Sequence, residues 1–416
     1  MESPATQPNV FANLNRPVPR ANTGSRVKDA ISDVLMRLVQ VERRFDPLMR
    51  PLFDAALRDP IARLVTALMN TRRTDEHVAP AEEKLLLGEE AFNQDVIATF
   101  RKQMAGLWQP SRYERGGNTK THGIVRGEFV VHGDLPAHLA KGIFATPHRY
   151  PAFVRFSGPG PYITPDIDDV GFMSLSVKLM EVPGPKLLDE ERGTQDFLTV
   201  CTPTFVTPDI RANAHLQRAS LQNASIFHFL NFSQPHVLDL IMQGLWTKTQ
   251  SSPLEAPYFS CVPYLLGDGQ AMQYSFWPIY QRRTPVPQLP RRPPDDYLRL
   301  ALQQTLAQED VSIEMRVQVQ TDSFRMPIEN NGVLWPESLS PRVPVATLRL
   351  PRQMVKHATS LQLARRLSFN PWHCIAEHRP LGSQSRARKL MYTTLADLRL
   401  RMNAIPHWEP TPGDLP

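Results

Sequence analysis

Three residues near the C-terminal end of the chain, Arg388, Tyr392 and Arg399, have types and spacing that could do chemistry. They lie in the segment SRARKLMYTTLADLRLRMN (385–403), whose pattern predicts a helix. Residues four apart share one face of a helix, and a residue seven further on returns to that face after about two turns. Two interpretations are open: a solvated face with a tyrosine between two cations, or a tyrosine kept as its phenolate.

The phenolate interpretation rests on electrostatics. A free tyrosine has a pKa near ~10, and an adjacent guanidinium favours its charged form. A phenolate is a hard anionic ligand for ferric iron, and tyrosine is one of the axial ligands that hold haem. In this interpretation Arg388 keeps Tyr392 ionised, and Arg399 pairs with a haem propionate because guanidinium and carboxylate groups fit each other.

Composition limits the class of protein. The chain has 416 residues, of which 41% are hydrophobic and 21% charged, as in a globular protein with a substantial core. No apolar run approaches the ~18 residues of a membrane span, and the N-terminus lacks the order of a secretory signal. The three cysteines, Cys201, Cys261 and Cys374, are too widely spaced for a zinc pair or a disulfide framework, so we expect a cytoplasmic protein. The net charge of +6 is spread along the chain, which does not predict a nucleic-acid partner.

The hydrophobic pattern divides the chain into four segments. We expect a disordered arm (1–24), a helical segment (25–110), a β-barrel with inserted helices (111–360) and a C-terminal segment with the Tyr392 helix (361–416). Helices are predicted at 236–246 and 295–308. Strands are predicted at 123–133, 152–157, 172–182, 194–201, 273–280, 311–320 and 345–350. About seven strands with long connections favour an α+β fold built around a barrel.

A second group of candidate residues lies at the first predicted strands. Thr121 and His122 come at the start of the first strand, in THGIVRGEFVVHG. Arg155 and Ser157 lie two apart in FVRFS and therefore point to the same face of a strand. A lone histidine is most often structural or exposed, and Arg155 with Ser157 could be an ordinary buried pair. The blocks DDVGFMSLSVKL and TQDFLTVCTPTFV follow in order.

Together these blocks resemble the haem catalase superfamily, and in particular its catalase-related branch of allene oxide synthases and small catalase-like peroxidases. KTHG resembles the distal-histidine motif, VRFS the barrel strand beside the haem, and RARKLMY the proximal R-x-x-x-Y motif. MPIENNGVLWPESLSPRVPVATLRLPRQ and FNPWHCIAEHRPLGSQSRARKLMY resemble later motifs of the branch, so the likeness spans about 112–403. The resemblance implies an antiparallel eight-stranded β-barrel with flanking helices, a C-terminal haem-ligand helix and buried haem b.

The resemblance also implies a role for each candidate residue. Tyr392 would be the axial iron ligand and Arg388 its partner, while Arg155 and Arg399 would hold haem propionates. His122 would stand over the distal face of the iron and move a proton to and from a hydroperoxide. Ser157 would hydrogen-bond His122 and fix its tautomer.

Two departures from the catalase pattern bear on the substrate. Catalases place an asparagine beside the distal histidine, whereas the candidate positions here are Val200 and Cys201. Thr121 precedes the histidine, as in allene oxide synthases. Both departures favour an organic hydroperoxide, with a fatty-acid hydroperoxide as the leading substrate class.

Other functions stay open at this point. One alternative is a peroxidase that uses hydrogen peroxide to oxidise a small metabolite, and another is a haem-binding protein without catalysis. A homo-oligomer is also left open, because the helices of 25–108 match the family only loosely.

Overall fold

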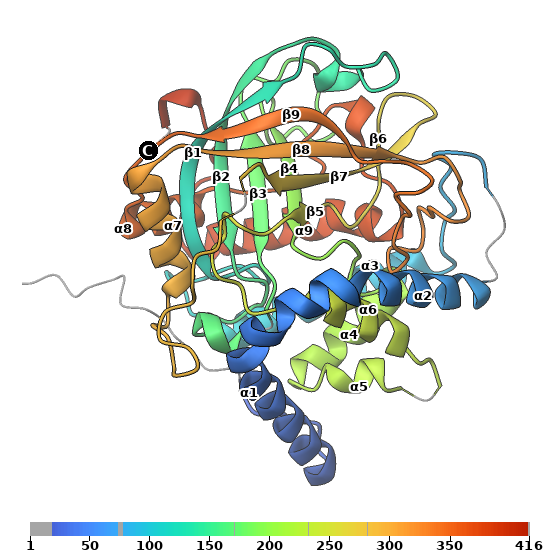
Figure 1. The fold of residues 1–416 in the computed structure, drawn as a ribbon, viewed down its shortest axis with the longest axis vertical. Coiled ribbons are helices and arrows are strands. Elements are labelled where there is room, and N and C mark those ends of the chain that lie inside the picture. Colours follow the sequence, from blue (N-terminus) through green and yellow to red (C-terminus); the bar gives the residue numbers. More distant parts are fainter. Residues whose placement is uncertain (1–18, 74–77, 170, 232, 281, 415–416) are drawn as a thin grey trace, which may run out of the picture.

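A closed barrel of eight antiparallel strands forms the centre of the molecule (Figure 1). The computed structural model describes residues 19–73, 78–169, 171–231, 233–280 and 282–414, so most of the predicted N-terminal arm lies outside the described residues. The strands are β1 (Thr121–Val131), β2 (Arg149–Ser157), β3 (Ser174–Leu179), β4 (Gln195–Val200), β5 (Tyr258–Phe259), β7 (Ala271–Pro278), β8 (Val311–Val319) and β9 (Val343–Leu350). Their order is β5-β4-β3-β2-β1-β9-β8-β7, and a β5–β7 pairing closes the ring. The predicted barrel is confirmed.

Side chains fill the inside of the barrel. Phe197 stacks on Phe129 with ring centroids 5.9 Å apart and meets Tyr274 edge-on at 5.1 Å. Successive side chains of a strand point to opposite faces, so the residues next to Phe197 on β4 point outward. A sizeable ligand therefore has to bind against the outer wall of the barrel, where the strands meet the helices.

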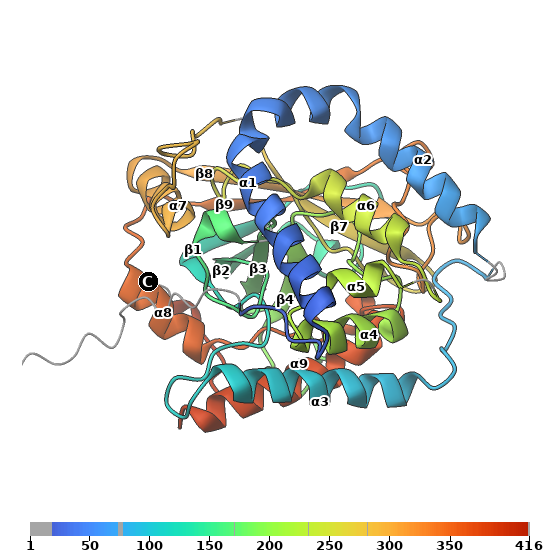
Figure 2. The ribbon, with the colours of Figure 1, turned by 90° about the horizontal axis from the view of Figure 1, so that it is seen from below.

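The helices lie outside the barrel. They are α1 (Arg26–Ala56), α2 (Arg58–Thr71), α3 (Glu89–Leu107), α4 (Ile210–Leu221), α5 (Ile226–Phe229), α6 (Val237–Trp246), α7 (Tyr297–Gln308), α8 (His357–Arg366) and α9 (Ser383–Met402). The helices predicted at 236–246, 295–308 and 385–403 are confirmed as α6, α7 and α9. In Figure 2, α3 and α9 run side by side, and the two helices are in contact. None of the helices in the described ranges is both long and apolar enough to cross a membrane.

The start of α9 is fixed by contacts with distant parts of the chain. Gly382 precedes the helix with φ +87, and a Cβ there would lie 2.6 Å from the Ile328 carbonyl oxygen, so only glycine fits. The Gly382 N–H donates to Glu83, and Arg386 in the first turn pairs with Glu83 at 2.7 Å and with Glu329 at 2.9 Å. These contacts set where the rest of α9 lies against the barrel.

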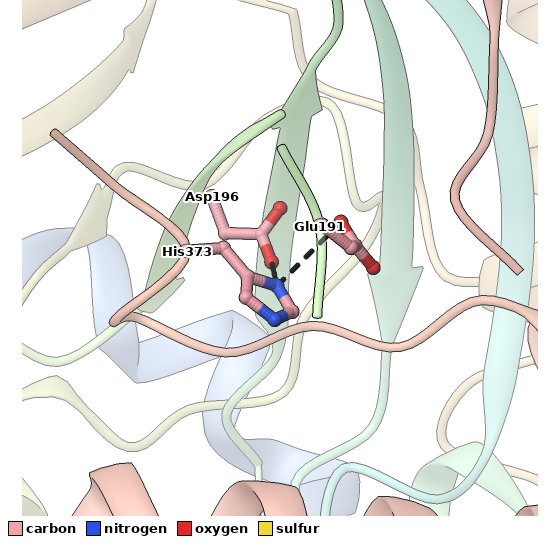
Figure 3. Close-up of side chains that lie close together, drawn as sticks. All are labelled: Glu191, Asp196 and His373. Atoms are coloured by element: carbon pink, nitrogen blue, oxygen red, sulfur yellow. Dashed lines mark hydrogen bonds and ion pairs between the residues drawn. The ribbon is translucent and has the colours of Figure 1, made fainter. Parts of the chain in front are cut away.

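A buried charge cluster fixes the segment before α9 to strands β3 and β4. Figure 3 shows Glu191, Asp196 and His373 pointing toward one another, with their ligand-type atoms within 4.8 Å. Such a group could hold a metal ion, but the Lys178 ammonium pairs with both carboxylates and lies 2.8 Å from Asp196. The cluster already contains a cation, so we read it as structural. It joins His373, from the segment that leads into α9, to the barrel wall.

The cluster predicts a pH dependence of stability. Burial and the Lys178 charge lower the pKa of His373, but hydrogen bonds to Asp196 and Glu190 outweigh them and raise that pKa to about 9. A raised pKa stabilises the fold fully below about pH 6.5 and ceases to do so as the pH rises through about 9. We expect the free energy of unfolding to fall by on the order of 2 kcal/mol across this window. Denaturant titrations at several pH values measure it.

The control is the matched substitution at another histidine. His373→Gln should remove most of this pH dependence, whereas His138→Gln, at an exposed position, should keep it. An unchanged pH profile in His373→Gln would show that the cluster does not act in this way.

Candidate functional site

The largest site described here is a cavity between α9 and the outer wall of the barrel. It encloses about 740 Å³ of empty space, including its opening to solvent. Helices α9 and α3 and strands β2, β3 and β4 contribute to its walls. Its apolar lining consists of Phe100, Leu198, Phe369, Met391, Leu395 and Ala396. Tyr392, Arg399 and Arg155 line the same cavity, as the sequence predicts for the two walls of one site.

Two buried arginines, Arg155 and Arg399, and the half-buried Arg115 line this cavity. Within the described part of the chain, none of them forms an ion pair with a carboxylate. The nearby Glu114 pairs instead with Arg365, at 3.0 Å. Burial lowers the pKa of Arg115 to about 10, and burial together with neighbouring arginines holds the pKa values of the other two well below their usual range. An anion bound in the cavity would compensate this charge.

Tyr392 and Arg388 lie one turn apart on α9, as predicted. The Arg388 Nη2 donates to the Tyr392 hydroxyl oxygen at 3.3 Å, and the guanidinium lies 5.2 Å from the centre of the phenol ring. Arg388 is buried, and this is its one hydrogen bond among the residues that the structure describes. Burial alone would lower the pKa of Arg388, but the neighbouring phenols, Tyr392 first, raise it. The guanidinium therefore stays charged and places a positive charge beside the Tyr392 hydroxyl.

Arg155 and Arg399 are held in place by neutral groups. Arg155 donates to the hydroxyl of Ser157 at 2.9 Å, to the hydroxyl of Thr121 at 2.9 Å and to the carbonyl of Asn118 at 2.6 Å. Arg399 donates to the carbonyl of Leu367 at 3.0 Å. These contacts orient the guanidinium groups and leave their charge uncompensated. Ser157 is therefore bonded to Arg155 and not to His122, which differs from the predicted serine–histidine bond.

His122 does not line the Tyr392 cavity but a second, smaller one. In the β1–β2 ladder Thr121 pairs with Ser157 and Gly123 pairs with Phe156, so His122 is the extra residue of a β-bulge. A bulge changes the direction of a side chain. Thr121 points toward Arg155, whereas His122 lies with Asp166, Met173, Gln250, Tyr297 and Arg43.

The second cavity keeps His122 neutral. Its ring nitrogens have no hydrogen-bond partner in the described part of the chain, and Nδ1 lies 3.8 Å from Asp166 Oδ1. Burial, helped by the positive charge of Lys120, holds the pKa of His122 well below its ordinary value. Burial also raises the pKa of Asp166 to about 6, although Lys120 lies 2.6 Å away. A neutral imidazole with free nitrogens can accept a proton from a small molecule.

The two positions proposed for the missing asparagine lie away from the Tyr392 cavity. Val200 pairs with Ser174 and Phe259 in the sheet. The Cys201 sulfur accepts from the Met173 N–H at 2.9 Å, and burial raises the pKa of this thiol to about 11. Cys201 is therefore an unreactive, buried thiol near the His122 cavity.

Several site residues were not predicted from the sequence. Arg115 lies in the loop sequence RGGN, which has neither helical nor strand periodicity. The one sequence signal for a binding residue here is an arginine followed by two glycines, close to His122. Asp166 and Lys120 were missed because their proximity depends on the fold. Leu198 and Phe369 give only the signal of ordinary core residues.

Comparisons with known proteins support the fold. No family model matches the chain, and no curated protein matches its sequence. A fungal catalase structure aligns with a TM-score of 0.55 and 16% identity, covering 83% of this chain and 70% of the other. Catalase A from Saccharomyces cerevisiae aligns with a TM-score of 0.55 and 16% identity, covering 83% of this chain and 71% of the other. The chain therefore has the catalase-like fold.

Proposed function

We propose that this chain is a haem enzyme that activates the O–O bond of a hydroperoxide. The observation that carries the proposal is one cavity that holds the Arg388–Tyr392 pair and the buried Arg155 and Arg399, which have no carboxylate partner among the described residues. A buried charge without a partner is costly, so its retention indicates an anionic ligand. Titration of the apoprotein with haem, followed by absorbance, tests binding.

The residues of the cavity fit haem b. Tyr392 would be the protein ligand to the iron, with the Arg388 guanidinium hydrogen-bonded to its oxygen. Arg155, Arg399 and Arg115 would pair with the propionates. Phe100, Leu198, Phe369, Met391 and Leu395 would cover the apolar ring. Haem bound in this cavity supplies the redox-active iron on which the O–O bond is cleaved.

A fatty-acid hydroperoxide is the proposed substrate class. Two features support it: Val200 and Cys201, the candidate positions for the asparagine that catalases carry, are not asparagine, and the Thr121–His122 pair resembles that of allene oxide synthases. His122 would accept the hydroperoxide proton, since its imidazole is neutral and its ring nitrogens are free. The expected products are an allene oxide, a cleaved aldehyde or a rearranged hydroxy or epoxy acid.

Product analysis separates this reaction from a peroxidase. Haem-loaded protein is incubated with a polyunsaturated fatty-acid hydroperoxide, and in parallel with hydrogen peroxide and a peroxidase donor. Rearranged or cleaved lipid without a donor would support the proposal. Donor oxidation with intact lipid would favour the metabolite-oxidising peroxidase instead.

Haem binding without catalysis is the second candidate, and one observation favours it. His122 lies in a cavity separate from that of Tyr392, so the described geometry does not place an acid–base group beside the phenolate. A haem carrier or sensor needs only the Tyr392 cavity. If haem binds but neither peroxide changes its absorbance except by bleaching, this second function is the correct one.

Tyr392→Phe tests the axial ligand. Loss of the hydroxyl removes the phenolate, so we expect a shifted Soret band and a large loss of haem affinity. Tyr280→Phe, at an exposed tyrosine, is the control and should bind like the wild type. An unchanged Soret band in Tyr392→Phe would refute the assignment.

Arg155→Met and Arg399→Met test the propionate sites. A hydrogen bond to a charged group contributes about 1.5–3 kcal/mol, so each substitution should weaken haem binding by roughly tenfold or more. Haem titration measures the change, with circular dichroism to check the fold. Arg211→Met, at an exposed arginine on α4, should leave affinity unchanged. Equal affinities in all variants would remove these arginines from the site.

His122→Ala tests the acid–base role. Because His122 does not line the Tyr392 cavity, we expect full haem binding. Cleavage of the hydroperoxide should slow by about 10²-fold or more, the usual contribution of a general acid–base group. Stopped-flow absorbance with saturating hydroperoxide measures the rate. A wild-type rate would exclude His122 from the mechanism.

A further inference from the structure

Helix α1 carries a row of exposed apolar side chains along most of its length. Val27 is 70% exposed, Val34 55% and Leu38 60%. The full row consists of Val27, Ile31, Val34, Leu38, Val41, Phe45, Leu48 and Leu52. Scattered exposed apolar residues are normal, but a continuous row marks an interaction surface. In Figure 2, α1 crosses in front of the barrel, with no other described element over it.

The spacing of this row is that of a coiled coil. Successive members are four, three, four, three, four, three and four residues apart, so they occupy the a and d positions of a heptad, with Ile31, Leu38 and Phe45 at a. Pro47 and Pro51 lie inside the helix beyond this point and favour a kink there, so we restrict the seam to 27–45. A strict a/d seam is narrower than the apolar face of an ordinary surface helix.

The opposite side of α1 contacts the body of the protein. Ser32 donates to the Asn223 carbonyl, and Arg50 donates to the Thr247 carbonyl at 2.9 Å. Asp46 accepts from the Thr249 N–H at 2.7 Å. These residues occupy heptad positions b and f, away from the seam. The body therefore contacts the side of α1 opposite the seam, and the seam stays exposed to a partner.

Charges beside the seam fit a second copy in parallel orientation. Arg37 occupies position g and Glu42 position e, and both are exposed without an ion-pair partner among the described residues. In a parallel pair of helices, position g of one faces position e of the next heptad in the other, which brings Arg37 opposite Glu42 twice. In an antiparallel pair centred on the seam, the two Arg37 side chains would face each other, although Lys28 would then face Glu42.

We propose that α1 of one copy packs in parallel against α1 of a second copy through this seam. The seam is short for an isolated coiled coil, but α1 is already folded against the body, so less ordering entropy is lost on association. The proposal is independent of haem binding and of the reaction.

Sedimentation velocity of the full chain over a range of concentrations tests it. The wild type should associate. Leu38→Glu should raise the dissociation constant about tenfold or more, since a buried leucine contributes about 1.5–3 kcal/mol. Val39→Glu is the matched control: it is exposed on the same helix but lies off the seam, and it should associate like the wild type. A wild type that stays monomeric would overturn the proposal.

Charge reversal tests the orientation. Arg37→Glu alone should weaken association, and adding Glu42→Arg should restore it, because the pairs reform with exchanged signs. Failure of the double variant to associate would overturn the parallel pairing. Flotation with vesicles of anionic phospholipid is run alongside, and a monomer that binds vesicles through Leu38 would assign the row to a lipid surface and overturn the proposal. Circular dichroism checks that each variant stays helical.

Discussion

Uncompensated positive charge beside the barrel is the constraint on which the site depends. Arg155 and Arg399 are buried and Arg115 is half-buried around one cavity with neutral hydrogen-bond partners, and Arg388 hydrogen-bonds only the Tyr392 phenol among the described residues. Burial of a guanidinium without an anion destabilises a fold. A ligand with negative charges of its own and an atom able to bind the Tyr392 oxygen would compensate this charge.

The surrounding elements position the two walls of that cavity relative to each other. Strand β2 presents Arg155, and α9 presents Tyr392 and Arg399. Contacts at Gly382 and the cluster around Lys178 fix α9 and the segment before it. On the same outer wall, Lys178 has two carboxylate partners, whereas Arg155 has none among the described residues. Lys178 is therefore compensated within the fold, and Arg155 is the cation to which the proposed ligand would bind.

Much of the fold follows from local pattern, and much of the site does not. Seven long strands have clear apolar patterns, so they can be predicted. Strand β5 has only two residues, Tyr258 and Phe259, and carries no period, although it closes the barrel. Tyr392, Arg155 and Arg399 were identified by type and spacing. The place of His122 was not, because the register shift at β1 depends on pairing between strands and leaves no trace in composition.

The bulge at His122 determines which side chain of β1 lies beside Arg155 when the length of the strand changes. Thr121 and His122 stand side by side, and the register of one strand decides which of them points toward the Arg155 side of the sheet. Side chains along a strand alternate, so a shift of one residue exchanges a hydroxyl for an imidazole at the same point in space. The pairing register of β1 therefore determines whether a hydroxyl or an imidazole faces Arg155. A single insertion or deletion there would exchange these two side chains beside Arg155.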